Sequence, residues 1–339
     1  MKEASDLKHG TYVPSPDRMR HEDTDKGITP FFGDPSLDAI LEKAIELYQI
    51  RDCEAALQNF NHALAGYRAQ QDMQGEGMAL SGIGLVCYAL GQYAEAIAHS
   101  YQALAIARQV LDRRTERQAL GNLGNAYRHL NDYAKAIEYK LQSLNVAREI
   151  GDLRGEMAAL NNLGMAYKSL GDHAAAIRFY EQSLQLAQAL KDTQVEGQVW
   201  RNLGNAYHSQ SNYPKTIECY EELLKLSKRV GDRHLEGQIL KNLASACYNL
   251  GNYEKAVIYH HQRLEIARIL NDYRNEEQAL ESLGVIYDAM SNYTMALDCY
   301  EQRLAVAKLM DDAALQEQAI ASLKSLCYII GDYARATRY

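Results

Sequence analysis

Cysteine and histidine are the residue types in this sequence that could bind a metal or act as nucleophiles. Among the six cysteines, Cys87, Cys247 and Cys327 are spaced by multiples of forty residues, and Cys219 and Cys299 share a second such spacing. No pair has the CxxC or Cys/His spacing of a zinc site. Free cysteine packs as a small hydrophobic residue. We therefore predict buried, reduced core residues at these positions, and no metal site.

The other candidates for chemistry are a histidine pair and the many acidic residues. His260 and His261 are adjacent, so on a helix their rings point about 100° apart, and we expect packing or solvated side chains rather than a shared metal. The sequence contains no glycine-rich phosphate loop, no HExxH and no GxSxG motif. Its aspartates and glutamates recur at fixed intervals and do not cluster with histidine. We predict a protein that is not an enzyme, with no cofactor.

Composition and charge exclude further classes. The net charge of −8 does not favour non-specific binding to nucleic acid or to anionic lipid. No apolar run approaches the length of about 18 residues that indicates a membrane span. The first residues, MKEASDLKHG, lack the apolar stretch of a signal peptide. We therefore expect a cytoplasmic protein without membrane insertion.

The elements that must position any site are copies of one forty-residue unit. The stretch ALGNLGNAYRHLNDYAKAIEY, residues 119–139, returns as ALNNLGMAYKSLGDHAAAIRFY, residues 159–180. Copies begin near residues 37, 77, 117, 157, 197, 237, 277 and 317, which gives seven complete units and a partial eighth. Self-similarity at a fixed period predicts a helical solenoid over residues 37–339. Residues 1–36 are polar and predict a flexible tail, unless the apolar cluster at residues 28–32 docks.

Each unit is predicted to contain two helices. Asp152 can cap a helix that runs to about Ser169, because its carboxylate accepts the first free backbone N–H groups. Gly171 can end that helix in the left-handed conformation. Asp172 then caps a second helix to about Ala189. Links of two residues leave only an antiparallel helical hairpin. Small residues such as Gly124 and Ala136 recur where the two helices would touch.

These residues resemble a known repeat. Leu-Gly, a tyrosine three residues later, a second tyrosine and then alanine resemble the tetratricopeptide repeat, whose usual period is about 34 residues. The forty-residue variant with LGNLGNAY, KAIEY and a closing GDxxGE resembles the Leu-Gly-Asn repeats of Pins-type adaptors. It is also similar to kinesin light chains and to bacterial tetratricopeptide proteins, and we expect a bacterial member. The resemblance implies an all-α fold, a right-handed superhelix of helical hairpins.

In such a fold the first helix of each unit lines a concave groove. One stripe of each first helix is apolar and faces the core, and the other is polar, as the spacings of three and four residues require. We take the polar stripe as the surface that binds a partner. Its candidate residues are Asn122, Asn125, Arg128, Asn161, Asn162, Lys168, Arg201, Asn202, Asn205, His208, Lys241, Asn242, Glu281 and Asp288.

The asparagines of this stripe have two interpretations. An asparagine side chain has one acceptor and two donors, so it can pair with both backbone groups of an extended peptide. The resemblance implies the same role, because related repeat proteins use concave asparagines to hold a ligand backbone. The same side chains could instead bridge to the neighbouring hairpin. The sequence does not decide between the two.

The charges of the stripe change sign along the chain. Arg128, Lys168, Arg201 and Lys241 are cationic, whereas Glu281 and Asp288 occupy equivalent positions one unit later. This order predicts a ligand with an acidic stretch against the central repeats. The alternative is that the charges only keep the groove hydrated.

The function that these observations predict is that of a scaffold or adaptor for another protein or peptide. One alternative is a peptide-responsive bacterial regulator of the Rap kind, although residues 1–36 are too short for the helical effector domain it would need. Another is a scaffold that assembles with itself. The oligomeric state is left open.

Overall fold

A computed structural model describes residues 35–339, and every regular element in that range is an α-helix. The described chain forms two compact units, one ending at Val195 and one running from Glu196 to Tyr339. Helix α1 begins at Pro35, so the predicted boundary at residues 36 and 37 falls inside this helix. The predicted tail and its apolar cluster at residues 28–32 otherwise lie outside the described residues.

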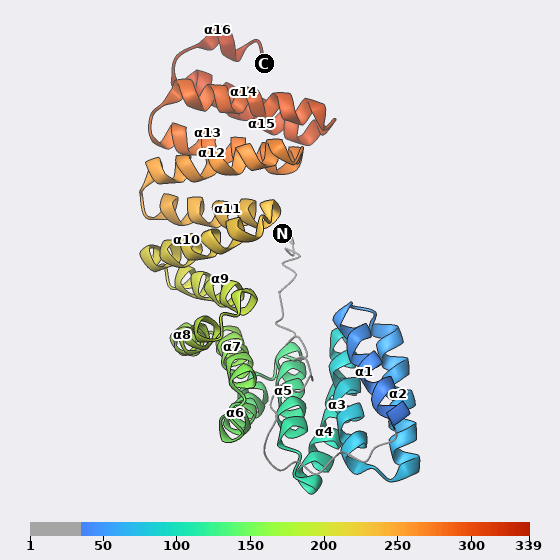
Figure 1. The fold of residues 1–339 in the computed structure, drawn as a ribbon. Coiled ribbons are helices and arrows are strands. Elements are labelled where there is room, and N and C mark those ends of the chain that lie inside the picture. Colours follow the sequence, from blue (N-terminus) through green and yellow to red (C-terminus); the bar gives the residue numbers. More distant parts are fainter. Residues whose placement is uncertain (1–34) are drawn as a thin grey trace. The chain divides into compact units, whose positions relative to one another are not determined.

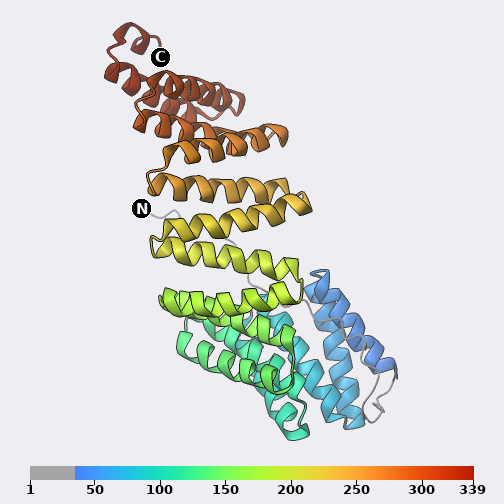
Figure 2. The same cartoon turned by 60° about the vertical axis from the view of Figure 1, so that its left-hand side comes forward.

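The first unit contains four helical hairpins, in which each helix packs against the next one along the chain (Figures 1 and 2). The hairpins are formed by α1 (Pro35–Gln49) with α2 (Cys53–Gln70), α3 (Met73–Ala89) with α4 (Tyr93–Val110), α5 (Arg113–His129) with α6 (Tyr133–Glu149), and α7 (Leu153–Leu170) with α8 (His173–Ala189).

The second unit continues the same alternation, and its start lies within α9. Its helices are α9 (Thr193–Ser209), α10 (Tyr213–Val230), α11 (Arg233–Asn249), α12 (Tyr253–Ile269), α13 (Tyr273–Ala289), α14 (Tyr293–Leu309), α15 (Ala313–Ile329) and α16 (Tyr333–Ala336). Since α16 has only 4 residues, the predicted partial eighth unit is confirmed. None of the described helices is long and apolar enough to cross a membrane.

Short polar caps set the helix boundaries, as predicted. The carboxylate of Asp152 accepts a hydrogen bond from the backbone N–H of Gly155 at 2.8 Å. Gly171 ends α7 with a φ of 91°, a conformation that costs glycine nothing sterically. Asp172 then caps α8 by accepting from the N–H of Ala175 at 2.9 Å. Gln92, which precedes α4, stands at the corresponding position and makes no side-chain cap.

Small residues allow the two helices of a hairpin to approach closely. A Cβ atom placed on Gly164 would lie 2.5 Å from the ring of Tyr180, and one on Gly284 would lie 2.4 Å from the ring of Tyr300. Both distances are too short for carbon atoms that are not bonded, so the tyrosine ring fills the space that a side chain would need. The glycine and the aromatic residue therefore form one packing unit, repeated along the chain.

Replacing Ala136 by leucine should lower the free energy of unfolding by roughly 1–3 kcal/mol, because the larger side chain overpacks the hairpin. Ala136 lies on α6 and has no exposed surface. Chemical denaturation followed by circular dichroism would measure the effect. Ala105, which is exposed on α4, provides the matched control, and its replacement by leucine should leave stability within about 0.5 kcal/mol. Equal stability of both variants would contradict the packing role.

Ion pairs join one hairpin to the next. Arg108, near the end of α4, places Nε 2.8 Å from Oε1 of Glu116 in the first turn of α5. Arg148 pairs with Glu156 in the same way at 2.7 Å, and Arg268 pairs with Glu276 at 2.7 Å. These glutamates lie in the first turn of their helices, where a negative charge also complements the helix dipole. The arginine eight residues earlier was missed, although its repetition at forty-residue intervals is visible in the sequence.

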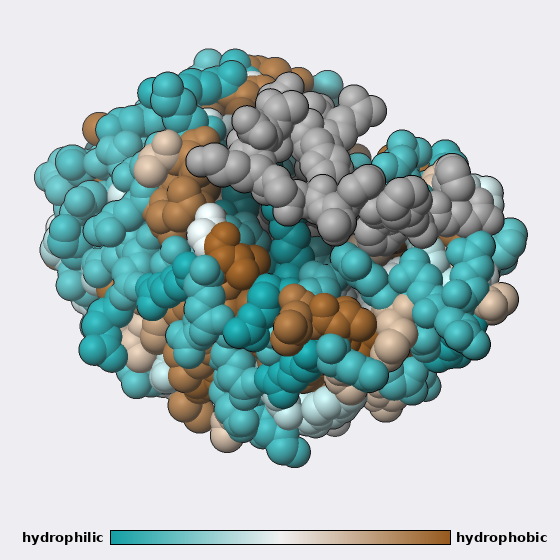
Figure 3. Space-filling view, turned by 60° about the horizontal axis from the view of Figure 1, so that its bottom comes forward, coloured by the Kyte–Doolittle hydropathy of each residue, from teal (hydrophilic) through white to brown (hydrophobic). Residues whose placement is uncertain are grey.

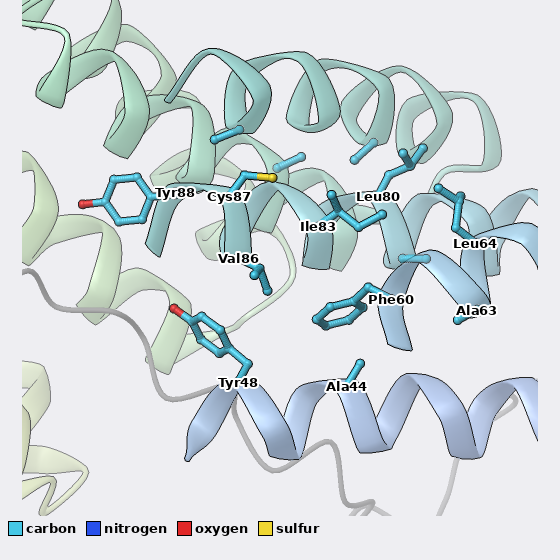
Figure 4. Close-up of a cluster of buried hydrophobic side chains, with 14 of the residues drawn as sticks. Ala44, Tyr48, Phe60, Ala63, Leu64, Leu80, Ile83, Val86, Cys87 and Tyr88 are labelled. Atoms are coloured by element: carbon cyan, nitrogen blue, oxygen red, sulfur yellow. The ribbon is translucent and has the colours of Figure 1, made fainter. Parts of the chain in front are cut away.

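The core of the first unit runs between successive helices (Figure 4). Tyr48 of α1, Phe60 of α2 and Ile83 of α3 belong to one buried cluster. Cys87 lies in the same cluster, and Cys219, Cys247, Cys299 and Cys327 are also buried. All six cysteines are free thiols, so the predicted packing role is confirmed for the five that are buried.

Candidate partner-binding surface

The predicted asparagines of the first unit are buried among the helices. Nδ2 of Asn122 on α5 donates to the backbone oxygen of Ser81 on α3 at 3.0 Å, so this side chain bridges neighbouring hairpins. Oδ1 of Asn125 accepts from Nζ of Lys140 at 2.6 Å. Asn161 and Asn162 on α7 are buried as well. In this structure the side chain of Asn122 therefore bridges neighbouring hairpins, as the second interpretation of the asparagines expects.

The predicted asparagines of the second unit are more accessible. Oδ1 of Asn205 accepts from the hydroxyl of Tyr220 at 2.7 Å, which ties α9 to α10. Asn202 is half-buried, and Asn242 on α11 is exposed. Asn242 is thus the predicted asparagine best placed to meet a ligand backbone.

A buried lysine lies beneath the polar stripe of the first unit. Lys140 on α6 is 2% exposed, and Nζ donates to the backbone oxygen of Gly121 at 2.7 Å as well as to Asn125. Burial, together with the charges of Arg128 and Arg117, holds the pKa of Lys140 well below its usual range. No role was predicted for this residue from the sequence. A visible signal was that lysine stands at the position where, forty residues later, Tyr180 packs on Gly164.

The predicted cations lie closer to solvent than the asparagines do. Arg128 and Lys168 are half-buried at the ends of α5 and α7 in the first unit. Nη2 of Arg128 donates to Nε2 of His129 at 2.9 Å, and burial lowers the pKa of Lys168. In the second unit Arg201 is half-buried and Lys241 is exposed.

Within residues 35–339, none of these four cations has a carboxylate partner. Many cations elsewhere in the described chain are paired, as in the contacts of Arg117 with Asp152 at 2.8 Å and of Lys215 with Glu218 at 2.7 Å. His208, also predicted on this stripe, is exposed and sets its ring edge-on to Tyr213, with centroids 5.6 Å apart.

The predicted acidic residues lie on α13. Oε1 of Glu281 is 3.0 Å from Nη2 of Arg303 on α14, and the Glu281 side chain remains half-exposed. Asp288 is half-buried near the end of α13. Within the second unit the predicted stripe has a cation on α11 and carboxylates on α13.

Beneath Glu281 lies a buried ion pair that the sequence analysis missed. Nε of Arg303 is 2.7 Å from Oε1 of Glu277, and both side chains are 3% exposed. Nη2 of Arg303 also donates to Gln318 on α15 at 3.4 Å. These contacts hold three helices of the second unit together through polar groups.

The histidine pair and the acidic residues form no metal site in the described part of the chain. His260 is buried, and burial lowers the pKa of His260 to about 3, with nearby cations acting in the same direction. Nε2 of His261 lies 2.9 Å from the hydroxyl of Tyr287. His260 is thus a packing residue, whereas His261 is exposed and its ring contacts Tyr287, and both fit the predicted choice between packed and solvated side chains.

Comparison with known families agrees with the hairpin geometry. The family model described as tetratricopeptide repeat matches residues 75–149, 115–189, 195–269 and 238–309, which together cover more than half of the chain. The chain belongs to the tetratricopeptide repeat family. The repeat expected from the sequence is thereby confirmed, and tetratricopeptide repeats are modules of protein–protein interaction. A comparison with curated proteins gives no match.

Solved structures with similar folds include a signal-transduction ATPase with a tetratricopeptide repeat sensor from Pyrococcus horikoshii. Its TM-score is 0.64 at 21% identity, and the match covers 89% of this chain but only 45% of the ATPase. A Rap protein complexed with Competence and Sporulation Factor matches at a TM-score of 0.56 and 17% identity, over 86% of this chain and 78% of that protein. The apo quorum sensor NprR from B. thuringiensis matches at 0.56 and 16%, over 89% and 85%.

Proposed function

We propose that this tetratricopeptide repeat protein is a scaffold that binds a segment of another protein along the polar stripe of its first helices. The cations of the stripe carry this proposal. Arg128 and Lys168 are partly removed from water, yet neither has a carboxylate partner in residues 35–339. A cation in that setting gains from a carboxylate that a ligand supplies, because the pair replaces lost hydration.

The ligand that fits this surface has an acidic stretch. In the first unit Arg128 and Lys168 would pair with its carboxylates. The second unit, taken by itself, offers a cation at Lys241 and the exposed amide of Asn242, which can bond to an extended backbone. The carboxylates of Glu281 and Asp288 would disfavour acidic residues at α13 and favour a basic one. Since the attraction is largely between charges near the surface, binding should weaken as salt concentration rises.

Reversing the charges of Arg128 and Lys168 should remove the preference for acidic ligands. Peptides selected from a random displayed library on the full-length chain should be rich in aspartate and glutamate. Against Arg128→Glu/Lys168→Glu, the selected peptides should lose about tenfold or more in affinity. Fluorescence anisotropy at low and high salt would measure the loss.

Two controls separate binding from folding. Arg178→Glu changes an exposed arginine on α8, and it should leave affinity near that of the wild type. Circular dichroism spectra and melting temperatures should match for all three proteins. Selected peptides that bind the double variant as tightly as the wild type would argue against the stripe as the ligand site.

A second candidate is a peptide-responsive regulator. The similarity to a Rap protein whose structure was solved with Competence and Sporulation Factor supports the idea that this fold can hold a peptide. A regulator should change shape on binding, whereas a scaffold need not. Small-angle X-ray scattering with and without a selected peptide would distinguish the two, through a change in radius of gyration.

A further inference from the structure

A pocket of about 680 Å³ lies in the first unit, at the edge where the first helices begin. It is formed by the turn between α4 and α5, the turn between α6 and α7, and Gln74 near the start of α3. Three successive hairpins therefore contribute to it. The volume falls within the range of about 300–1,000 Å³ that is usual for binding pockets. None of the residues predicted on the polar stripe lines it.

The lining of the pocket includes apolar side chains that face water. Leu111 is 78% exposed and Leu153 is 48% exposed, and both line the pocket beside Val110 and Ile150. Figure 3 shows that hydrophobic residues lie exposed among hydrophilic ones on the face that it draws.

Leu111 is in addition held in an unfavourable backbone conformation. Its φ is 58°, in the left-handed region, which a leucine adopts only at a cost. At the same position forty residues earlier stands Gln71, and forty residues later stands Gly151, both with positive φ. A leucine at this position is therefore explained neither by burial nor by backbone geometry. Contact with a ligand would explain it.

The lining of the pocket also carries positive charge. Arg113, Arg114 and Arg154 line the pocket together with Asp112 and Asp152. Both aspartates are used within the protein, since they cap α5 and α7 and Asp152 also pairs with Arg117. Arg113 contacts Glu116 and Glu149. A guanidinium has five donors, so an arginine with one or two partners can still bind a ligand carboxylate.

We propose that this pocket binds a protein segment in which an aliphatic or aromatic side chain is flanked by carboxylates. The apolar side chain would cover Leu111 and Ile150, and the carboxylates would pair with Arg114 and Arg154. Asp112 and Asp152 would repel a continuous polyanion such as nucleic acid, so isolated carboxylates beside an apolar group are the better match. The site is separate from the polar stripe and does not depend on the function proposed above.

Selection of displayed random peptides on the full-length chain tests the proposal. One enriched class should combine an apolar residue with neighbouring aspartate or glutamate. Synthetic peptides of this class should bind Leu111→Gln and Arg114→Glu about tenfold more weakly than the wild type, and should bind Arg128→Glu/Lys168→Glu normally. Leu111→Gln introduces the residue that already occupies this conformation at Gln71, so its fold should be intact.

Matched controls make the outcome decisive. Leu309→Gln changes a leucine that is 72% exposed and lies outside the pocket, and Arg178→Glu changes an exposed arginine on α8. Both should leave the affinity of these peptides unchanged. The proposal is overturned if no enriched peptide depends on Leu111 or Arg114, or if the peptides that do so lack carboxylates. The proposal is also overturned if only the control variants lose binding to these peptides.

Discussion

Replacing Arg303 by methionine should lower the free energy of unfolding of the second unit by about 3–5 kcal/mol, because Glu277 would be left buried without its partner. The two side chains are 3% exposed and 2.7 Å apart, so water cannot take the place of the guanidinium. The chain has one tryptophan, Trp200 on α9, and its fluorescence during urea denaturation reports on this unit.

A double variant decides whether the loss comes from the unpaired charge. Arg303→Met/Glu277→Met removes both charges together, and its stability should return to the wild-type value or exceed it by about 1–4 kcal/mol. Arg274→Met serves as the control, since Arg274 lies 3.6 Å from Asp312 and is mostly exposed, and pairs of that kind contribute about 0–1 kcal/mol. The interpretation fails if the double variant is as unstable as Arg303→Met.

Replacing Lys140 by tyrosine should raise the free energy of unfolding of the first unit at pH 7 by about 1–3 kcal/mol. Folding buries Lys140 among cations, which disfavours its protonated form. Tyrosine fits the same site in the second unit, where Tyr220 packs on Gly204 and donates to Asn205 at 2.7 Å. Thermal unfolding followed by circular dichroism would show the gain, and Lys225→Tyr on the exposed surface of α10 should show none.

The same substitution should change how stability depends on pH. The ordinary pKa of lysine is 10.5, and the pKa of folded Lys140 lies well below it. Between these two values the unfolded chain holds a proton that the folded chain lacks, so the stability of the wild type rises with pH. As the pH rises toward 10.5, the wild type should therefore gain stability relative to Lys140→Tyr. A constant difference across this range would show that Lys140 is not neutral in the folded protein.

Much of the fold could be predicted from the sequence because its signals are local. A cap such as Asp152 acts on backbone groups within its own turn, and the glycine opposite Tyr180 acts within one hairpin. Repetition at forty residues then shows which of these local signals are structural. The ion pair of Arg148 with Glu156 was available from the same repetition and was overlooked.

The accessibility of the polar stripe could not be predicted in this way. Asn122 and Asn242 occupy equivalent positions, yet Asn122 is buried and Asn242 is exposed. Asn122 lies where α5 packs directly on α3, and its side chain there donates to the backbone oxygen of Ser81. The distance between consecutive first helices depends on all the side chains between them. It therefore cannot be predicted from the sequence of one repeat. The pocket beside Leu111 was missed for the same reason, because three hairpins build it.

The arginine–glutamate pairs between hairpins also bear on how such a chain could lengthen or shorten during evolution. Helices contact chiefly their neighbours along the chain, and each pair spans a fixed eight residues across a turn. Deleting forty residues within one unit would therefore remove a whole hairpin and join its neighbours with equivalent caps and charges facing each other. A deletion of three or four residues would misalign every contact beyond it. Gene duplication and loss are thus tolerated in steps of one repeat, whereas small insertions inside a helix are not.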